Sequence, residues 1–175
     1  MKPENKFRNW FIGQFRVWAE KEHPGCKVRV QKHADYATDG IPDIDLAIHG
    51  MTMWLEVKLL TSCQEVRKIN VTPLQRANLE QSASAGVPAG LLIGLALGPR
   101  KGYRVAVFVP PLSEVAHRDM FRPVELACEK LYAMADEASS RSYARFNAPD
   151  PDARTIIFTS GPHGDDRDSA TEDGG

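Results

Sequence analysis

The chain has 175 residues, of which 42% are hydrophobic and 26% are charged, as in an ordinary globular domain. This length allows one domain with a sizeable hydrophobic core. The longest apolar stretch, residues 86–97, is interrupted by Pro88 and by glycines, so we expect no membrane-spanning helix and no membrane partner. The N-terminus lacks the apolar core of a signal peptide, and the sequence therefore predicts a cytoplasmic protein.

The charges are distributed unevenly, although the net charge is only −1. Residues 146–175 carry a net charge of −5, and residues 1–145 carry +4. Residues 1–32 alone carry +5, which suits contacts with the phosphates of a nucleic acid. A helix with a charged, solvated face explains this excess equally well.

The three cysteines, Cys26, Cys63 and Cys128, lie far apart and form no CxxC pair. This spacing argues against a structural zinc site. We expect reduced thiols, as in most proteins of a reducing compartment.

The first predicted element is a helix over residues 3–22. Its apolar side chains recur at steps of three and four residues and form one stripe: Phe7, Trp10, Phe11, Phe15 and Trp18. Aromatic residues at this spacing favour packing in the core over a platform for stacking bases. The helix ends near Gly25, and residues 27–31 then alternate as in a strand, with Val28 and Val30 turned inward.

A hairpin is predicted next, after a polar loop at residues 33–40. Residues 44–48 and 53–58 read as apolar strands. A tight turn at His49-Gly50 joins them.

A polar connector over residues 59–70 leads to a second helix with a clearly marked start. Thr72 is the expected N-cap, Pro73 occupies the first helical position, and Gln75 stands where a capping box places Glu or Gln. The helix continues until Gly86 stops it.

The remainder of the chain predicts a second hairpin, a third helix, a last strand and an acidic tail. Their ranges are 91–97 and 103–109 for the hairpin, 123–139 for the helix and 154–159 for the strand. Residues 161–175 are rich in Gly, Asp and Ser, which predicts a disordered acidic tail after a single domain over residues 1–160. This order of elements predicts an α/β or α+β sandwich with a mixed central sheet.

Three residues of the first hairpin carry the strongest chemical signal: Asp43, Glu56 and Lys58. Alternate side chains of a strand share a face, so Glu56 and Lys58 point together while Val57 turns into the core. If the segment that holds Asp43 pairs alongside, two carboxylates meet, and such a pair suits Mg²⁺ or Mn²⁺. A lysine beside them can position an attacking water or offset charge on a phosphate. A turn aspartate and a surface Glu-Lys pair are the plainer alternatives.

Three short motifs occur in a characteristic order: Gly40-Ile41-Pro42-Asp43, then Glu56-Val57-Lys58, then Thr72-Pro73-Leu74-Gln75. With these motifs, about residues 4–109 resemble the PD-(D/E)XK nuclease superfamily. The order and spacing are most similar to its VRR-NUC and Holliday-junction-resolvase-like branch. The resemblance implies an α/β fold with a restriction-endonuclease-like core, in which helices flank a mixed central β-sheet.

The resemblance also implies roles for single residues. Asp43 and Glu56 would be the metal ligands, the carbonyl group of Val57 would add an oxygen, and Lys58 would position the attacking hydroxide. Gln75 would reach the active site and orient the water or the lysine. A capping role explains Gln75 equally well, and we do not expect one side chain to fulfil both roles.

Further polar residues are weaker candidates. Glu4 is the candidate for the acid that many members carry on their first helix and would join the metal ligands, although an acid near a helix N-terminus is favoured anyway. Asp45 lies two residues after Asp43 and is either an extra ligand or, as we favour, a solvent-facing acid. His33 could contact the substrate or carry a proton, but a lone loop histidine is usually an ordinary surface residue.

Contacts with DNA phosphates are expected from basic residues and one histidine: Lys6, Arg8, Lys32, His33 and Lys68. The sequence has no helix-turn-helix or zinc-finger signature for reading bases. We therefore expect recognition of DNA structure over DNA sequence.

The predicted function is that of a Mg²⁺- or Mn²⁺-dependent endodeoxyribonuclease. Branched or junction DNA in replication, repair or recombination is the favoured substrate, and a phage-encoded role fits as well. Cutting a junction needs two active sites, which would require a homodimer. The alternatives are a catalytically inactive nuclease-fold protein that binds nucleic acid or a host protein, and an α/β protein with a chance motif.

Overall fold

The computed structural model describes residues 2–33, 41–61, 66–98, 101–112 and 115–147. The predicted strand at residues 154–159, the acidic tail with its boundary at residue 160, and Cys63 lie outside these described residues. Within them, each helix is too short or too polar to cross a bilayer.

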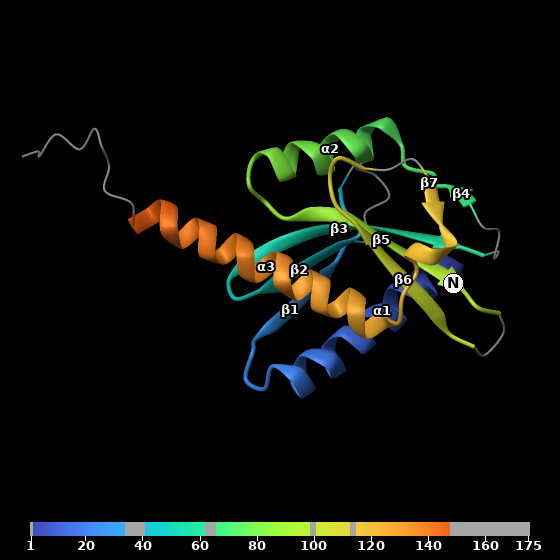
Figure 1. The fold of residues 1–175 in the computed structure, drawn as a ribbon, viewed down its shortest axis with the longest axis horizontal. Helices are drawn as coiled ribbons and strands as arrows, with labels where there is room; N and C mark the ends of the chain where they lie inside the picture. Colours follow the sequence, from blue (N-terminus) through green and yellow to red (C-terminus); the bar gives the residue numbers. More distant parts are fainter. Residues whose placement is uncertain (1, 34–40, 62–65, 99–100, 113–114, 148–175) are drawn as a thin grey trace, which may run out of the picture.

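The helices and strands follow one another along the chain as drawn in Figure 1. They are α1 (Pro3–Glu22), β1 (Val28–Lys32), β2 (Ile44–Ile48), β3 (Met51–Leu60), β4 (Val66–Lys68), α2 (Pro73–Ser84), β5 (Ala89–Ala96), β6 (Tyr103–Phe108), β7 (Val115–His117), the 3₁₀ helix η1 (Arg118–Met120) and α3 (Val124–Asn147).

A mixed five-stranded sheet with the order β1-β2-β3-β5-β6 organises the described part of the chain. Neighbouring strands are antiparallel except β3 and β5, which are parallel. A parallel pair needs a crossover connection, and α2 lies within it. The predicted α/β class, with helices flanking a mixed central sheet, is confirmed.

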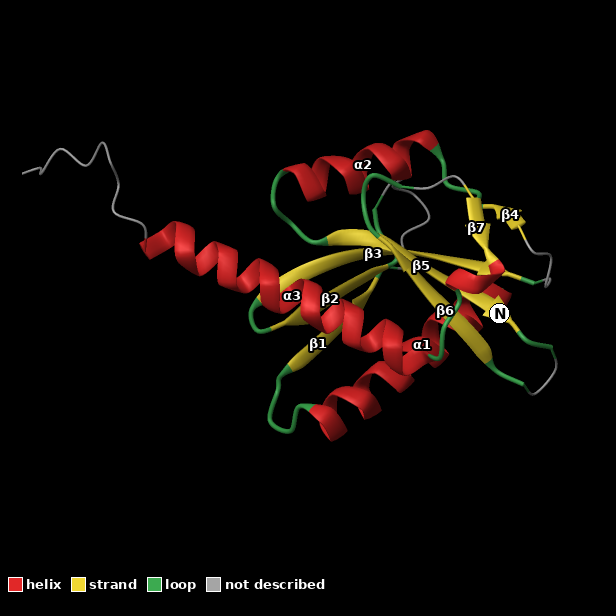
Figure 2. Ribbon diagram, viewed as in Figure 1, coloured by secondary structure: helices red, strands yellow, loops and turns green. Residues whose placement is uncertain are grey.

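Two hydrophobic layers hold the helices against the sheet. Figure 2 shows α1 and α3 on one face of the sheet and α2 on the other. The predicted aromatic stripe of α1 lies in the first layer, where Phe7, Phe11 and Phe15 are almost completely buried with α3 residues such as Leu131. Leu79 of α2 packs in the second layer. The stripe is therefore core, as the spacing predicted.

The turn between β2 and β3 is the tight turn expected at His49-Gly50. His49 has a φ of 51° and Gly50 a φ of 80°, so both lie in the left-handed region that two-residue hairpin turns of this kind require. The turn places Ile44 opposite Leu55. This register decides which side chains meet at the far end of the hairpin.

Two parts of the fold differ from the sequence expectation. The polar connector contains β4, which pairs with β7 in a small separate sheet. Neither three-residue strand is long enough to show a period, and each depends on a distant partner. The third helix continues to Asn147, beyond the predicted end at residue 139, and an Arg141–Glu137 ion pair one turn apart supports its last turns.

Gly94 allows α1 to pack closely on the sheet, because it has no side chain. A Cβ atom at Gly94 would lie 2.6 Å from the buried ring of Phe7. We expect Gly94→Ala to lower the free energy of unfolding by about 1–3 kcal/mol, measured by urea denaturation. Gly13 lies within α1 with open space around it, so Gly13→Ala should stabilise the protein by up to about 1 kcal/mol. Equal effects of both substitutions would contradict this account.

Candidate active site

The candidate site forms where Asp43, just before β2, lies beside the middle of β3. Because Ile44 is opposite Leu55, Asp43 comes next to Glu56 and Val57. The Asp43 Oδ2 atom accepts a hydrogen bond of 2.9 Å from the backbone N–H group of Val57. The expectation that the Asp43 segment pairs alongside the Glu56 strand is therefore met by geometry.

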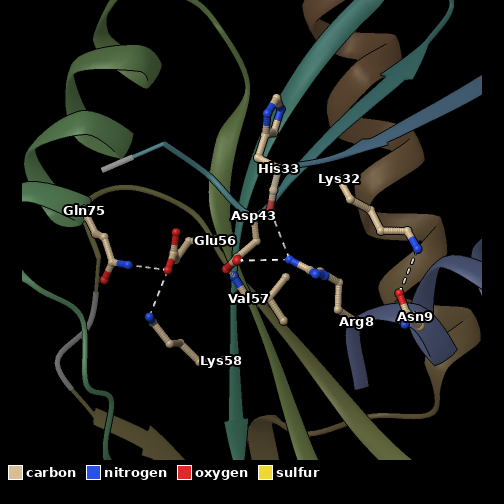
Figure 3. A network of polar contacts seen from close by, with 9 residues as sticks. All are labelled: Arg8, Asn9, Lys32, His33, Asp43, Glu56, Val57, Lys58 and Gln75. Atoms are coloured by element: carbon tan, nitrogen blue, oxygen red, sulfur yellow. Dashed lines mark hydrogen bonds and ion pairs between the residues drawn. The ribbon is translucent and has the colours of Figure 1, made fainter. Parts of the chain in front are cut away.

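Glu56 and Lys58 share one face of β3, and the buried side chain of Val57 lies in the opposite layer. The Lys58 Nζ atom donates a hydrogen bond of 2.8 Å to the Oε1 atom of Glu56. Only 4% of Glu56 is exposed, so its carboxylate depends on such partners for the solvation it has lost. Figure 3 shows Asp43, Glu56 and Lys58 close together, with Gln75 approaching from α2.

Gln75 closes the capping box and also reaches the candidate site, although we expected one side chain not to do both; its role of orienting the water or the lysine stays a prediction. Its Oε1 atom accepts a hydrogen bond from the N–H group of Thr72, while the Thr72 hydroxyl accepts one from the N–H group of Gln75. This reciprocal pair is the predicted capping box. The Gln75 Nε2 atom remains available and donates to Oε1 of Glu56. The earlier expectation was wrong because an amide carries an acceptor and donors on separate atoms.

Arg8 is placed differently from the phosphate contact that the sequence suggested. Its side chain is only 11% exposed and turns inward, with Nη1 3.4 Å from Oδ1 of Asp43. The same Nη1 atom donates to the backbone carbonyl group of His33. Arg8 thereby ties α1 to the segment that carries Asp43, a contact that sequence reasoning missed. The available signal in the sequence was the position of Arg8, one helical turn after the candidate acid Glu4.

Glu4 lies in the first turn of α1, within electrostatic reach of the other charged groups. Burial raises the pKa of its carboxyl group, the negative charge of Asp43 raises it further, and the ammonium group of Lys58 opposes both effects. No three Asp, Glu, His or Cys side chains of the described ranges converge closely enough to hold a metal ion by themselves. A role of Glu4 as a metal ligand stays a prediction.

The donor set still fits a hard divalent cation. Mg²⁺ usually takes one or two carboxylates and fills its remaining positions with waters and substrate phosphates. Asp43 and Glu56 supply two such carboxylates, and the Asp43 side chain is 31% exposed and therefore accessible. Both carboxylates keep lone pairs beyond those used by their hydrogen-bond partners.

The pKa of Glu56 is raised to about 7, first by burial and then by the nearby charge of Asp43, against the lowering effects of Lys58. A cation between the two acids would remove this penalty, because opposite charge favours the ionised form. Proton and cation therefore compete for the same carboxylate.

His33 and Asp45 form a separate pair beside the site. The Nε2 atom of His33 lies 2.9 Å from Oδ2 of Asp45. The ring nitrogen makes no directed hydrogen bond, so this contact is one of proximity. Asp45 faces the imidazole, and a role of His33 toward a substrate stays a prediction.

The remaining basic candidates lie at different places. Lys6 is exposed on α1, and Lys32 is exposed at the end of β1, where its Nζ atom donates to Asn9. Lys68 lies in β4, and its side chain is outside what the structure describes. Contacts of Lys6, Lys32 and Lys68 with DNA stay a prediction.

Comparison with known proteins gives a limited result. No protein-family model matches the sequence. No curated protein matches it. Among solved structures, the fold is similar to that of Hjc, a Holliday junction resolvase from the archaeal hyperthermophile Archaeoglobus fulgidus. The two chains are 12% identical, the match covers 73% of this chain and 97% of that chain, and the TM-score is 0.47. A likeness of this degree does not extend to activity or to site residues.

The raised pKa of Glu56 predicts a pH-dependent stability of the metal-free protein. The unfolded carboxyl group has an ordinary pKa near 4.5 and the folded one a pKa of about 7, so the folded state binds more protons between these values. The free energy of unfolding should therefore fall as pH rises through this window, by up to about 3 kcal/mol. Glu56→Gln should flatten this fall in chemical denaturation, while Glu20→Gln at an exposed position of α1 should leave it unchanged. An unaltered pH profile in Glu56→Gln would refute the assignment.

Gln75→Glu should separate the two roles of this residue. Glutamate also closes a capping box, but it has no N–H donor for Glu56 and brings a second negative charge to it. We expect the helix content, measured by circular dichroism, to stay unchanged. The melting temperature should fall well above pH 7, where both glutamates are ionised, and should fall less below pH 7. The same charge change at exposed Gln81 of α2, in Gln81→Glu, should have little effect. A pH-independent loss in Gln75→Glu would mean that only helix capping matters.

Proposed function

We propose that the protein is a Mg²⁺- or Mn²⁺-dependent DNA endonuclease of the PD-(D/E)XK type. The observation that carries this proposal is the meeting of Asp43, Glu56 and Lys58 at one point of the sheet. A structural role alone gives no reason to bury a carboxylate whose pKa is raised toward neutrality beside a second acid. A cation-binding role does, because the cation stabilises both ionised acids.

Each residue has a distinct task in the proposed reaction. Asp43 and Glu56 would hold the divalent ion, which would polarise the scissile phosphate and lower the pKa of a bound water. The Val57 amide and Arg8 orient the Asp43 carboxylate. Lys58, whose side chain is 19% exposed, would offset charge that develops on the phosphate.

The proposed chemistry is hydrolysis of a phosphodiester bond. Water attacks phosphorus in line with the 3′-oxygen, forming one P–O bond and breaking the bond to the 3′-oxygen. The water oxygen stays on a 5′-phosphate, and a proton ends on the 3′-hydroxyl group of the other product. During the reaction, Gln75 would keep the Glu56 carboxylate in position by the hydrogen bond that its Nε2 atom donates.

Branched or junction DNA is the substrate that we propose, in replication, repair or recombination. The described fold presents a sheet with flanking helices and no separate module for reading bases in a groove. Recognition of DNA shape suits such a protein. Symmetric cutting of a four-way junction would require a homodimer, since each chain carries one candidate site.

The test compares the wild-type protein with Glu56→Ala and Lys58→Ala on linear, flapped, forked and four-way DNA. With Mg²⁺ or Mn²⁺ we expect cutting by the wild type, a rate at least about 100-fold lower in both variants, and no cutting in EDTA. Glu20→Ala, at an exposed position of α1, serves as the control and should cut normally.

Two outcomes would contradict the proposal. Equal cutting by Glu56→Ala and the wild type would place the activity elsewhere or in a contaminant. DNA binding without any cutting by the folded wild type would favour an inactive nuclease fold.

A further inference from the structure

A group of arginines lies on the same sheet face as the candidate active site. Leu60 pairs with Leu95, and Leu95 pairs with Arg104, so these side chains form one row across β3, β5 and β6. Lys58 stands two residues before Leu60 and therefore points to the same face. From the spacing of strands and the rise per residue, the Cα atoms of Lys58 and Arg104 are about 12 Å apart.

Arg118 of η1 joins Arg104 at the edge of this face. The two arginines line a hollow of about 170 Å³ together with Leu95 and Leu97. Both arginines are exposed. Within the described ranges neither arginine makes an ion pair. Asp119 follows Arg118 directly in the sequence, but it also forms no ion pair with either arginine. Among the described residues, no carboxylate therefore lies within ion-pair distance of the two guanidinium groups.

The form of the hollow suits an oxyanion. Guanidinium groups present a planar fork of N–H donors that matches the oxygens of a phosphate. The other two residues that line the hollow, Leu95 and Leu97, have apolar side chains that offer no competing acceptor. Exposed Lys101 lies in the connection between β5 and β6, which also contains Leu97 of the hollow.

We propose that Arg104 and Arg118 bind a backbone phosphate of the DNA substrate, some nucleotides away from the phosphate that is cut. The inference rests on the proposed nuclease function and adds to it the path of the DNA. That path leads from the candidate site to the end of the β5–β6 pair where the hollow lies. This DNA path does not include Arg8 or Lys32, because Arg8 contacts Asp43 and Lys32 donates to Asn9.

The experiment measures DNA binding without cutting. Fluorescence anisotropy with a labelled four-way junction in EDTA, over a series of NaCl concentrations, yields the affinity and its salt dependence. The variant is Arg104→Gln/Arg118→Gln. The matched control is Arg16→Gln/Lys27→Gln, which removes the same charge at exposed positions of α1 and of the loop before β1.

We expect the arginine variant to bind on the order of tenfold or more weakly than the wild type at low salt. Its slope of log affinity against log salt should decrease by about one, since the loss of one phosphate contact removes close to one unit. The charge-conserving variant Arg104→Lys/Arg118→Lys should recover most of the slope. The control should change both quantities much less.

Equal losses in the arginine variant and in the control would overturn the inference and leave the proposed nuclease function standing. Absence of salt-dependent binding by the wild type would overturn both. If the glutamine double variant fails to melt cooperatively, the single variants Arg104→Gln and Arg118→Gln carry the test, and each should weaken binding and lower the slope more than the control does.

Discussion

The candidate site depends on one electrostatic constraint, which is the burial of the Glu56 carboxylate beside Asp43. Loss of water makes the ionised form of Glu56 costly, and the second acid increases that cost. Lys58 and Gln75 both donate to the same oxygen of Glu56, which keeps the side chain in place without neutralising the pair fully. The arrangement is most stable with an added positive charge, either a proton or a cation. This preference for an added positive charge follows from the positions of the two acids.

The fold meets this constraint by bringing three separate elements to one place. The turn at His49-Gly50 sets the β2–β3 register and with it the position of Asp43. The strand β3 presents Glu56 and Lys58 on the face that α2 covers, and the capping box aims Gln75 at Glu56. On the opposite side, Arg8 connects α1 to Asp43. Helix capping and site assembly are thus parts of the same hydrogen-bond network.

Local signals in the sequence were enough for much of this picture. Alternation in residues 53–58 predicted that Glu56 and Lys58 share a face, and Thr72-Pro73 predicted the start of α2. Contacts between distant residues were not predictable in this way. Arg8 and Asp43 are 35 positions apart, so no periodicity links them. The pairing of β4 with β7 and the meeting of Arg104 with Arg118 likewise depend on tertiary structure alone.

The parallel pairing of β3 with β5 has a consequence for the order of folding. The β2–β3 hairpin is local, so the hydrogen bond from Val57 to Asp43 joins residues that are close in the sequence. Gln75 reaches Glu56 only when α2 packs, and α2 packs against a sheet that needs β5. Closing such a non-local crossover comes late and slowly in folding. We therefore expect the hydrogen bond from Gln75 to Glu56 to form later in folding than the β2–β3 hairpin, because it depends on a crossover that only β5 completes.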